Sequence, residues 1–359
     1  LIQPAVGLIG NLGYVVVCIL GGTLAAGGAI SVGDIQAFIQ YVRSFTQPIS
    51  QVANVTNVLQ QTAAAAERVF EFLDEAEETP EAEHPVQVDI APDGAVTLRY
   101  TDADGHNHSD PFVGDIAFQH VRFGYSDDKI IIHDFSAHVE PGAQVAIVGP
   151  TGAGKTTMVK LLLRFYDLQG GAITIDGHNI RDFGRNDLRS LFGMVLQDTW
   201  LYNDTIRENI RYGRLDASDE EVVSAAKAAR VDHFVKTLPE GYNVVMNEES
   251  SNVSQGQKQL LTIARAILAD PKILILDEAT SSVDTKTEVD IQRAMTRLMA
   301  GRTSFVIAHR LSTIRDADLI LVMNDGDIVE QGNHEALMAR QGFYANLYNA
   351  QFDAGEEAG

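Results

Sequence analysis

The chain has 359 residues and a net charge of −22 at neutral pH, because 49 acidic side chains outweigh 27 basic ones. This length allows two or three domains with full-sized cores. The acidic balance argues against non-specific nucleic-acid binding through a basic face, so we expect no nucleic-acid partner. The only cysteine, Cys18, lies in an apolar run, which excludes a disulfide framework and a thiolate metal site. Apolar sequence begins at once at Leu1, which indicates a fragment or a processed chain.

Residues 1–33 carry no charged side chain and are rich in glycine. A membrane-spanning helix needs about 20 apolar residues, and small residues allow such helices to pack closely. We therefore predict a membrane helix over about residues 3–30. A signal peptide requires a basic start and a shorter apolar region, and this segment has neither. The remaining alternative is a buried helix of a soluble domain.

Residues 32–73 carry apolar side chains at helical spacing, from Ile35 to Val58, and a second face of glutamine and asparagine. At 1.5 Å per residue this helix is roughly 60 Å long, about twice the thickness of a bilayer core. It should cross the membrane, kink at Pro48 and project beyond, with its polar stripe facing protein or water. Arg43 is either a substrate-path residue or half of an ion pair with a helix outside this chain.

Residues 74–114 form an acidic linker whose single basic residue is Arg99, a composition typical of a solvated segment. Two short apolar stretches on either side of Pro92-Asp93-Gly94 predict a short hairpin. His106 and His108 allow a metal site as one interpretation. No full ligand set surrounds them, and a solvated loop is the simpler interpretation.

From residue 115 to residue 352 the pattern changes to short apolar strands separated by helical segments, and residues 353–359 form a tail. Continuously apolar strands with intervening helices indicate an α/β fold with a mostly parallel sheet that is covered on both faces. The four clearest strands are residues 144–148, 192–196, 273–276 and 303–307.

A phosphate-binding loop follows the first of these strands and leads into an apolar helical segment, as the G-x-x-x-x-G-K-[ST] motif requires. Its backbone N–H groups should wrap the phosphates, Lys155 should reach the β- and γ-phosphates, and Thr156 should offer its hydroxyl to Mg²⁺. The residues expected to bind ATP here are Gly149, Pro150, Thr151, Gly152, Ala153, Gly154, Lys155, Thr156 and Thr157.

The four strands lead into Gly149, Gln197, Asp277-Glu278 and His309. Ligands of open α/β sheets lie at the carboxyl ends of the strands, so these groups should converge on one nucleotide. Asp277 is placed to hold Mg²⁺, and Gln197 to sense the metal or the γ-phosphate. Glu278 is the candidate for orienting or deprotonating the attacking water. His309 is expected to contact the γ-phosphate.

A second anion-binding surface is predicted at Ser254-Gln255-Gly256-Gln257, about a hundred residues further along the chain. Ser254 is expected to cap a helix that begins in a glycine-containing turn. Such a helix end presents free backbone N–H groups and a partial positive charge. A single ATP needs only one phosphate cradle, so the second cradle indicates a second chain.

Together these segments resemble the cassette of an ATP-binding cassette (ABC) exporter half-transporter, over about residues 115–350. The chain looks like the C-terminal part of such a protein, with its last two membrane helices and its whole nucleotide-binding domain. The motifs that match are Walker A (149–156), the Q-loop (Gln197), the signature (253–257), Walker B (273–278), the D-loop (281–284) and the switch histidine (His309).

The resemblance implies a P-loop NTPase cassette with a helical subdomain and an antiparallel β-subdomain, preceded by an all-α transmembrane segment. Two cassettes of this family pair head to tail. Ser254, Gly256 and Gln257 would thus complete the ATP site of a partner chain, and Asp284 would lie at the interface. Tyr125 lies where the family stacks an aromatic ring on adenine.

Some residues depart from the family pattern. The commonest signature is Leu-Ser-Gly-Gly-Gln, and Val253 and Gln255 replace its first and third residues. Residues 246–251 lack the usual Gly-Glu-x-Gly pattern, so crosstalk with the membrane domain is expected to differ. The acidic linker is longer than usual. Four of the six membrane helices of a half-transporter lie outside the chain. The segment of Trp200, Tyr202 and Asn203 would receive coupling helices of the membrane domain.

The resemblance implies ATP-driven export with ATP and Mg²⁺ as cofactors, in the plasma membrane, with several membrane spans and a cytoplasmic nucleotide-binding domain. The implied partners are a second half-transporter chain, identical or different, membrane lipid, and a transported small molecule, lipid or peptide. One alternative is a soluble ABC ATPase outside transport. Another is a cassette that binds ATP to gate or scaffold, with little hydrolysis.

Overall fold

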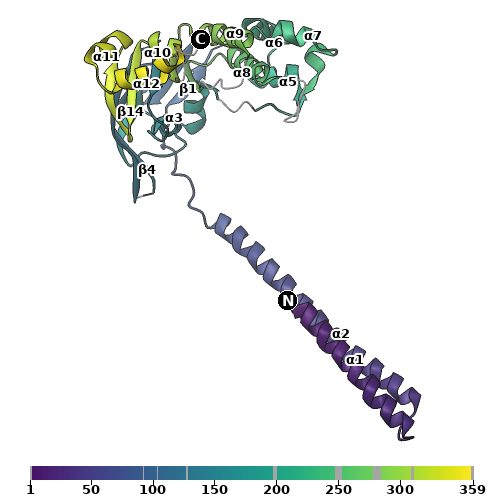
Figure 1. The fold of residues 1–359 in the computed structure, drawn as a ribbon. Helices are drawn as coiled ribbons and strands as arrows, with labels where there is room; N and C mark the ends of the chain where they lie inside the picture. The colour runs from purple at the N-terminus through teal and green to yellow at the C-terminus, as the bar shows by residue number, and fades with distance from the viewer. Residues whose placement is uncertain are drawn as a thin grey trace. The chain divides into compact units, whose positions relative to one another are not determined.

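The computed structural model describes residues 2–91, 93–102, 104–126, 128–196, 200–246, 253–277, 284–308 and 311–356. The chain divides into two compact units, Leu1–Thr79 and Pro80–Gly359 (Figure 1).

The first unit is a hairpin of two helices, α1 (Ile2–Ala26) and α2 (Val32–Leu73). α1 ends a few residues before the predicted boundary because two glycines follow Ala26, and glycine favours helix ends. Ser31 begins α2 with a capping box: its hydroxyl accepts from the Asp34 N–H at 3.3 Å, and its own N–H donates to the Asp34 carboxylate at 2.8 Å. α2 continues through Pro48 as one helix.

One helical stretch in the described part of the chain, Gly7–Ala26, is long and apolar enough to cross a membrane, with a mean hydropathy of 1.9. Almost none of it is buried within the chain, unlike the core helix of a soluble domain. α2 does not pass the same test, because glutamine, asparagine and threonine interrupt its apolar residues.

A six-stranded sheet forms the centre of the second unit, in the order β15–β14–β6–β13–β12–β9. Every neighbouring pair is parallel except β14 with β15. This confirms the predicted mostly parallel sheet. Its strands are β6 (Gln144–Val148), β9 (Phe192–Val195), β12 (Ile273–Asp277), β13 (Thr303–Ile307), β14 (Leu319–Asn324) and β15 (Asp327–Gly332).

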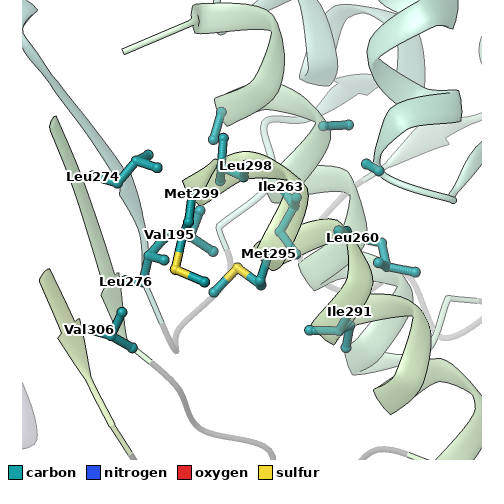
Figure 2. Close-up of a cluster of buried hydrophobic side chains, with 14 of the residues drawn as sticks. Val195, Leu260, Ile263, Leu274, Leu276, Ile291, Met295, Leu298, Met299 and Val306 are labelled. Carbon is teal, nitrogen blue, oxygen red and sulfur yellow. The ribbon is translucent and has the colours of Figure 1, made fainter. Parts of the chain in front are cut away.

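Both faces of this sheet are buried, which explains why its strands are continuously apolar. Along β12, Leu274 and Leu276 belong to one buried cluster, and Ile273 and Ile275 to the other. Figure 2 shows Leu274 and Leu276 facing side chains of the helical layer, including Met295.

The helical layer contains α8 (Gln255–Ala269) and α9 (Thr285–Met299), which Figure 1 shows beside α5, α6 and α7. Leu260 and Ile263 of α8 and Met295 of α9 join the same buried cluster as the sheet. The other elements of this region are β10 (Asp204–Thr205), α5 (Ile206–Arg211), α6 (Asp219–Ala228), α7 (Asp232–Thr237), a 3₁₀ turn (Gly241–Asn243) and β11 (Val245–Met246).

A four-stranded antiparallel sheet covers the other face, in the order β5–β4–β7–β8. Phe118 and Phe135 pack edge to face at 5.2 Å, and Phe118 also meets Phe305 of the central sheet. The strands are β4 (Ile116–Ser126), β5 (Lys129–Val139), β7 (Gly170–Ile175) and β8 (His178–Asn179). The remaining helices are α3 (Lys155–Leu162), α4 (Arg185–Ser190), α10 (Leu311–Arg315), α11 (His334–Arg340) and α12 (Phe343–Glu356).

The segment expected to be a solvated acidic linker forms a third sheet, of β1 (Gln87–Ile90), β2 (Val96–Thr101) and β3 (Asn107–Pro111). The predicted hairpin is confirmed, since β1 and β2 pair antiparallel. Val96 and Leu98 are buried in the same core as the antiparallel sheet, while Arg99 faces out. The expectation of a solvated segment is therefore wrong for β2, whose alternating apolar side chains are buried in the domain core, whereas β3 is exposed along its whole length.

Candidate functional site

The phosphate-binding loop connects β6 directly to α3. Gly149 and Gly154 both have positive φ, and a Cβ atom at Gly149 would collide with the carbonyl oxygen of Met323. A Cβ at Gly154 would lie 2.8 Å from Ile132. Only glycine fits these two positions. Gly154 is the N-cap of α3 and supplies no side-chain cap, so the first N–H groups of the helix face an anion-binding position.

Lys155 is half-buried, and its ammonium group donates to the carbonyl oxygens of Gly149 at 2.7 Å and Pro150 at 2.9 Å. Burial lowers the pKa of Lys155, and the nearby Asp277 carboxylate partly offsets this effect. Thr156, the next residue, is exposed. The loop therefore holds its cation in place with its own carbonyl groups, next to an exposed hydroxyl.

The strand registers bring the predicted strand ends to one edge of the sheet. Asp277 pairs with Ile307, Ile307 pairs with Ile147, and Leu276 pairs with Val195. Half-buried Asp277 thus ends its strand at the same edge as the phosphate-binding loop.

Three predicted catalytic residues, Gln197, Glu278 and His309, lie outside the described residues, as do residues 281–283 of the expected D-loop. Glu278 directly follows the end of β12 in sequence, and Gln197 and His309 come two residues after the ends of β9 and β13. Their roles stay predictions.

Tyr125 lies beside the helix of the phosphate-binding loop. Its hydroxyl is 3.2 Å from the Thr157 hydroxyl, and the Lys160 ammonium lies 5.8 Å from its ring centroid. Phe123 and Tyr166 each meet the ring edge to face at 5.1 Å. The Tyr125 side chain is half exposed, so it can accept a flat ligand. Sequence reasoning missed Tyr166, because the contact joins residues far apart in the chain.

Ser254 caps α8, as predicted from its sequence. Its hydroxyl accepts from the Gln257 N–H at 3.3 Å, and its N–H donates to the Gln257 side-chain oxygen at 2.9 Å. Val253 and Gly256 are buried, whereas Ser254 is exposed. Val253 therefore replaces leucine as an apolar anchor, while the polar end of the helix remains on the surface.

Asp284 is the N-cap of α9 and accepts from the Thr287 N–H at 3.0 Å. Hydrogen bonding from the Thr287 side chain, and then from the Thr287 backbone N–H, holds the pKa of Asp284 below its ordinary value. Asp284 is exposed, so it remains accessible at the surface while it caps α9.

Exposed aromatic rings form a surface that follows the expected Q-loop. Trp200 and Tyr202 meet edge to face at 5.5 Å, and Tyr202 stacks on Tyr212 at 6.4 Å. Buried Asn209 donates to the carbonyl of Tyr202. Arg265 of α8 lies over the Tyr212 ring at 5.3 Å and donates to the carbonyl of Trp200. The sequence had indicated Trp200 and Tyr202, but not the side chains that support them.

His106 lies on the exposed turn between β2 and β3, and His108 lies on the exposed strand β3. Asp102, Asp104 and His106 present ligand atoms within 4.8 Å of one another. The Asp102 carboxylate already accepts from the backbone N–H groups of Asp104 and His106, and lies 2.8 Å from the His108 ring. Hydrogen bonds within the turn account for this arrangement without a metal ion.

The fold and the loop define a class of protein, the P-loop nucleotide-binding domains: a glycine-rich loop between a parallel strand and its helix, with an acid at the end of a nearby strand. The model of the ABC transporter family matches residues 132–281. Residues 132–281 belong to the ABC transporter family, whose cassette domain binds ATP.

Relatives extend the similarity to nearly the whole chain. A fatty acid ABC transporter ATP-binding/permease protein of Mycobacterium bovis is 54% identical over 350 residues, which are 98% of this chain and 52% of the relative. An ATP-dependent lipid A-core flippase of Syntrophus aciditrophicus is 40% identical, covering 99% of this chain and 56% of the relative.

Among solved structures, a bacterial Atm1-family ABC exporter with ATP bound matches with a TM-score of 0.68 at 36% identity. The match covers 98% of this chain and 59% of that one. The chain therefore spans about half the length of the curated relatives it matches.

Proposed function

We propose that this chain is the C-terminal part of an ATP-driven exporter subunit. Residues 1–73 would supply its last two membrane helices, and residues 115–352 its nucleotide-binding domain. Residues 74–114 would join them, and 353–359 would be a tail. The whole protein would be a multi-pass protein of the plasma membrane, with the nucleotide-binding domain in the cytoplasm.

One observation carries this proposal: the parallel strands β6, β13 and β12 bring the phosphate-binding loop and Asp277 to the same edge of one sheet. ATP would bind along residues 149–157, with its adenine on Tyr125. The exposed Thr156 hydroxyl and the half-buried Asp277 carboxylate are oxygen ligands of the kind that Mg²⁺ takes, and Gln197 would add a third. Bound Mg²⁺ neutralises charge on the phosphates.

Hydrolysis would depend on side chains at the ends of the strands. Glu278 would orient the attacking water, and His309 and Lys155 would contact the γ-phosphate. Gln197 would couple the state of this phosphate to the neighbouring aromatic surface, which would receive the coupling helices of the membrane domain.

Each ATP would lie between two chains. Exposed Ser254, buried Gly256 and half-buried Gln257 would complete the site of a partner cassette. Asp284 would lie at this interface. The partner would be a second half-transporter chain, identical or different.

The cargo would be an amphipathic molecule of the lipid or drug type. Two observations support this: the relatives include proteins named as a fatty acid transporter and a lipid A-core flippase, and α2 combines apolar side chains with a polar stripe.

The proposal is tested by Glu278→Gln in the full-length protein. We expect ATP hydrolysis about a hundredfold to a thousandfold slower, the usual scale for a group that acts on the transition state. ATP binding should persist, since phosphate contacts remain. Glu335→Gln, at an exposed position on α11, is the matched control. Unchanged turnover in Glu278→Gln would contradict the role of this residue, and no turnover in the unaltered protein would contradict the export function.

A further inference from the structure

Arg43 is an unusual charge for its place in the chain. Residues 1–66 contain only two charged side chains, Asp34 and Arg43. The Asp34 carboxylate is held at the start of α2 by the Ser31 N–H and hydroxyl, both at 2.8 Å. Arg43 lies about 17 Å further along the helix axis, at 1.5 Å per residue from Val32. In the proposed exporter, with α2 entering the bilayer at its first residue, Arg43 would lie near the midplane of a bilayer core about 30 Å thick.

The immediate surroundings of Arg43 do not neutralise its charge. Its guanidinium lies 5.9 Å from the centroid of the Tyr14 ring, a cation–π contact. Within the described part of the helical hairpin, no carboxylate forms an ion pair with Arg43. Charges at this depth face a cavity or a partner and mark substrate paths, because lipid cannot solvate them.

A pocket of about 500 Å³ opens beside Arg43 between the two helices. Asn11 and Tyr14 of α1 and Gln47 of α2 line it with polar groups. Gly10 lines the α1 side of the pocket without a side chain. A Cβ atom at Gly10 would lie 3.1 Å from the Thr46 methyl group, so the two helices pack closely at this point. The volume is within the range of small-molecule sites, about 300–1,000 Å³.

We propose that this pocket binds the anionic head group of an amphipathic cargo, with Arg43 as its counter-ion. A guanidinium presents a planar fork of donors that matches a carboxylate or a phosphate. Asn11 and Gln47 supply further polar contacts, and apolar side chains of the hairpin accommodate the tail. This inference rests on the proposed export function, and it narrows the cargo to anionic amphiphiles.

The test uses the full-length protein in nanodiscs of phosphatidylcholine, a lipid without net charge. Binding of four probes with the same oleyl chain is measured: oleate, oleyl phosphate, oleyl alcohol and oleylamine. In the unaltered protein, at least one anion should bind more tightly than the alcohol, and the amine most weakly. The two anions distinguish a carboxylate site from a phosphate site. This comparison requires no variant, so it remains valid if a substitution impairs folding.

Arg43→Gln should weaken binding of the preferred anion about tenfold to a hundredfold, as expected for one charge-assisted hydrogen bond, and leave oleyl alcohol binding unchanged. Arg68→Gln is the matched control, because it removes a charge from the same helix outside the pocket. Equal binding of oleate, oleyl phosphate and oleyl alcohol would overturn the inference. So would an equal loss of all four probes in Arg43→Gln, which would indicate an ion pair with another helix. Basal ATP hydrolysis in the unaltered protein, measured alongside, reports on the export function separately.

Discussion

At the scale of single residues, the phosphate-binding loop is prepared for its ligand before any nucleotide arrives. Lys155 donates to two carbonyl oxygens of its own loop. Gly149 and Gly154 adopt backbone conformations with positive φ at positions where a Cβ atom would collide with a neighbour. Tyr125 is fixed at its edges by Phe123 and Tyr166 while its side chain remains half exposed. Binding therefore orders few side chains, which reduces its entropic cost.

Tyr125→Leu should weaken ATP binding about fivefold to a hundredfold, because stacking of a base on an aromatic ring contributes about 1–3 kcal/mol. Titration of ATP into the full-length protein measures this change. Tyr125→Phe keeps the ring and loses only the hydroxyl contact to Thr157, so it should bind nearly normally. Tyr212→Leu removes an exposed ring elsewhere and serves as the control. If Tyr125→Leu binds ATP with normal affinity, the adenine does not stack on Tyr125.

At the scale of elements, two helices of the same domain begin in the same way. Ser254 caps α8 through Gln257, and Ser218 caps α6 through Glu221, with hydrogen bonds of similar length. The two serine caps should therefore stabilise their helices by similar amounts. Only Ser254 is proposed to contact the nucleotide of a partner chain.

Ser254→Ala and Ser218→Ala should each lower the free energy of unfolding by about 1 kcal/mol, the usual contribution of an N-cap side chain. Only Ser254→Ala should also slow ATP hydrolysis, because only Ser254 is proposed to contact nucleotide. Thermal unfolding and turnover, measured on both variants, separate the two effects. Equal ATP turnover in the two variants would show that Ser254 only caps the helix and does not contact nucleotide.

The sequence predicted the elements that depend on local signals. The four central strands were visible as apolar runs, and the start of α8 as Ser254 at a glycine-containing turn. The pairing of β1 with β2 was predicted, but the third strand β3 and the burial of Val96 and Leu98 in the domain core were missed, because acidic composition dominated the interpretation. Contacts such as Tyr125 with Tyr166 depend on tertiary packing, and no local pattern encodes them.

At the scale of the whole molecule, the chain carries two phosphate-seeking surfaces, and the proposed function assigns them to different nucleotides. The unit of activity would then be a pair of chains. An isolated cassette would bind ATP and hydrolyse it poorly, since half of each site would be absent.

Complementation tests this pairing. Lys155→Ala disables the phosphate-binding loop, and Ser254→Arg blocks the other surface, so neither variant alone should hydrolyse ATP. If two copies of this chain form the transporter, a mixed pair contains one intact site and should recover up to about half of normal turnover. Two different affinity tags isolate the mixed pair. Recovery cannot occur if both surfaces serve the nucleotide of their own chain, and failure of the two tags to copurify would indicate a different partner chain.

α8 has one further consequence, which is mechanical. The helix begins beside Ser254, and eleven residues later Arg265 lies over Tyr212 and donates to Trp200 and Asn209. The two points are about 16 Å apart along one helix axis. We expect α8 to move as one rigid body. A displacement of the aromatic surface would then be accompanied by a displacement of Ser254, and the reverse would hold for a displacement that begins at Ser254.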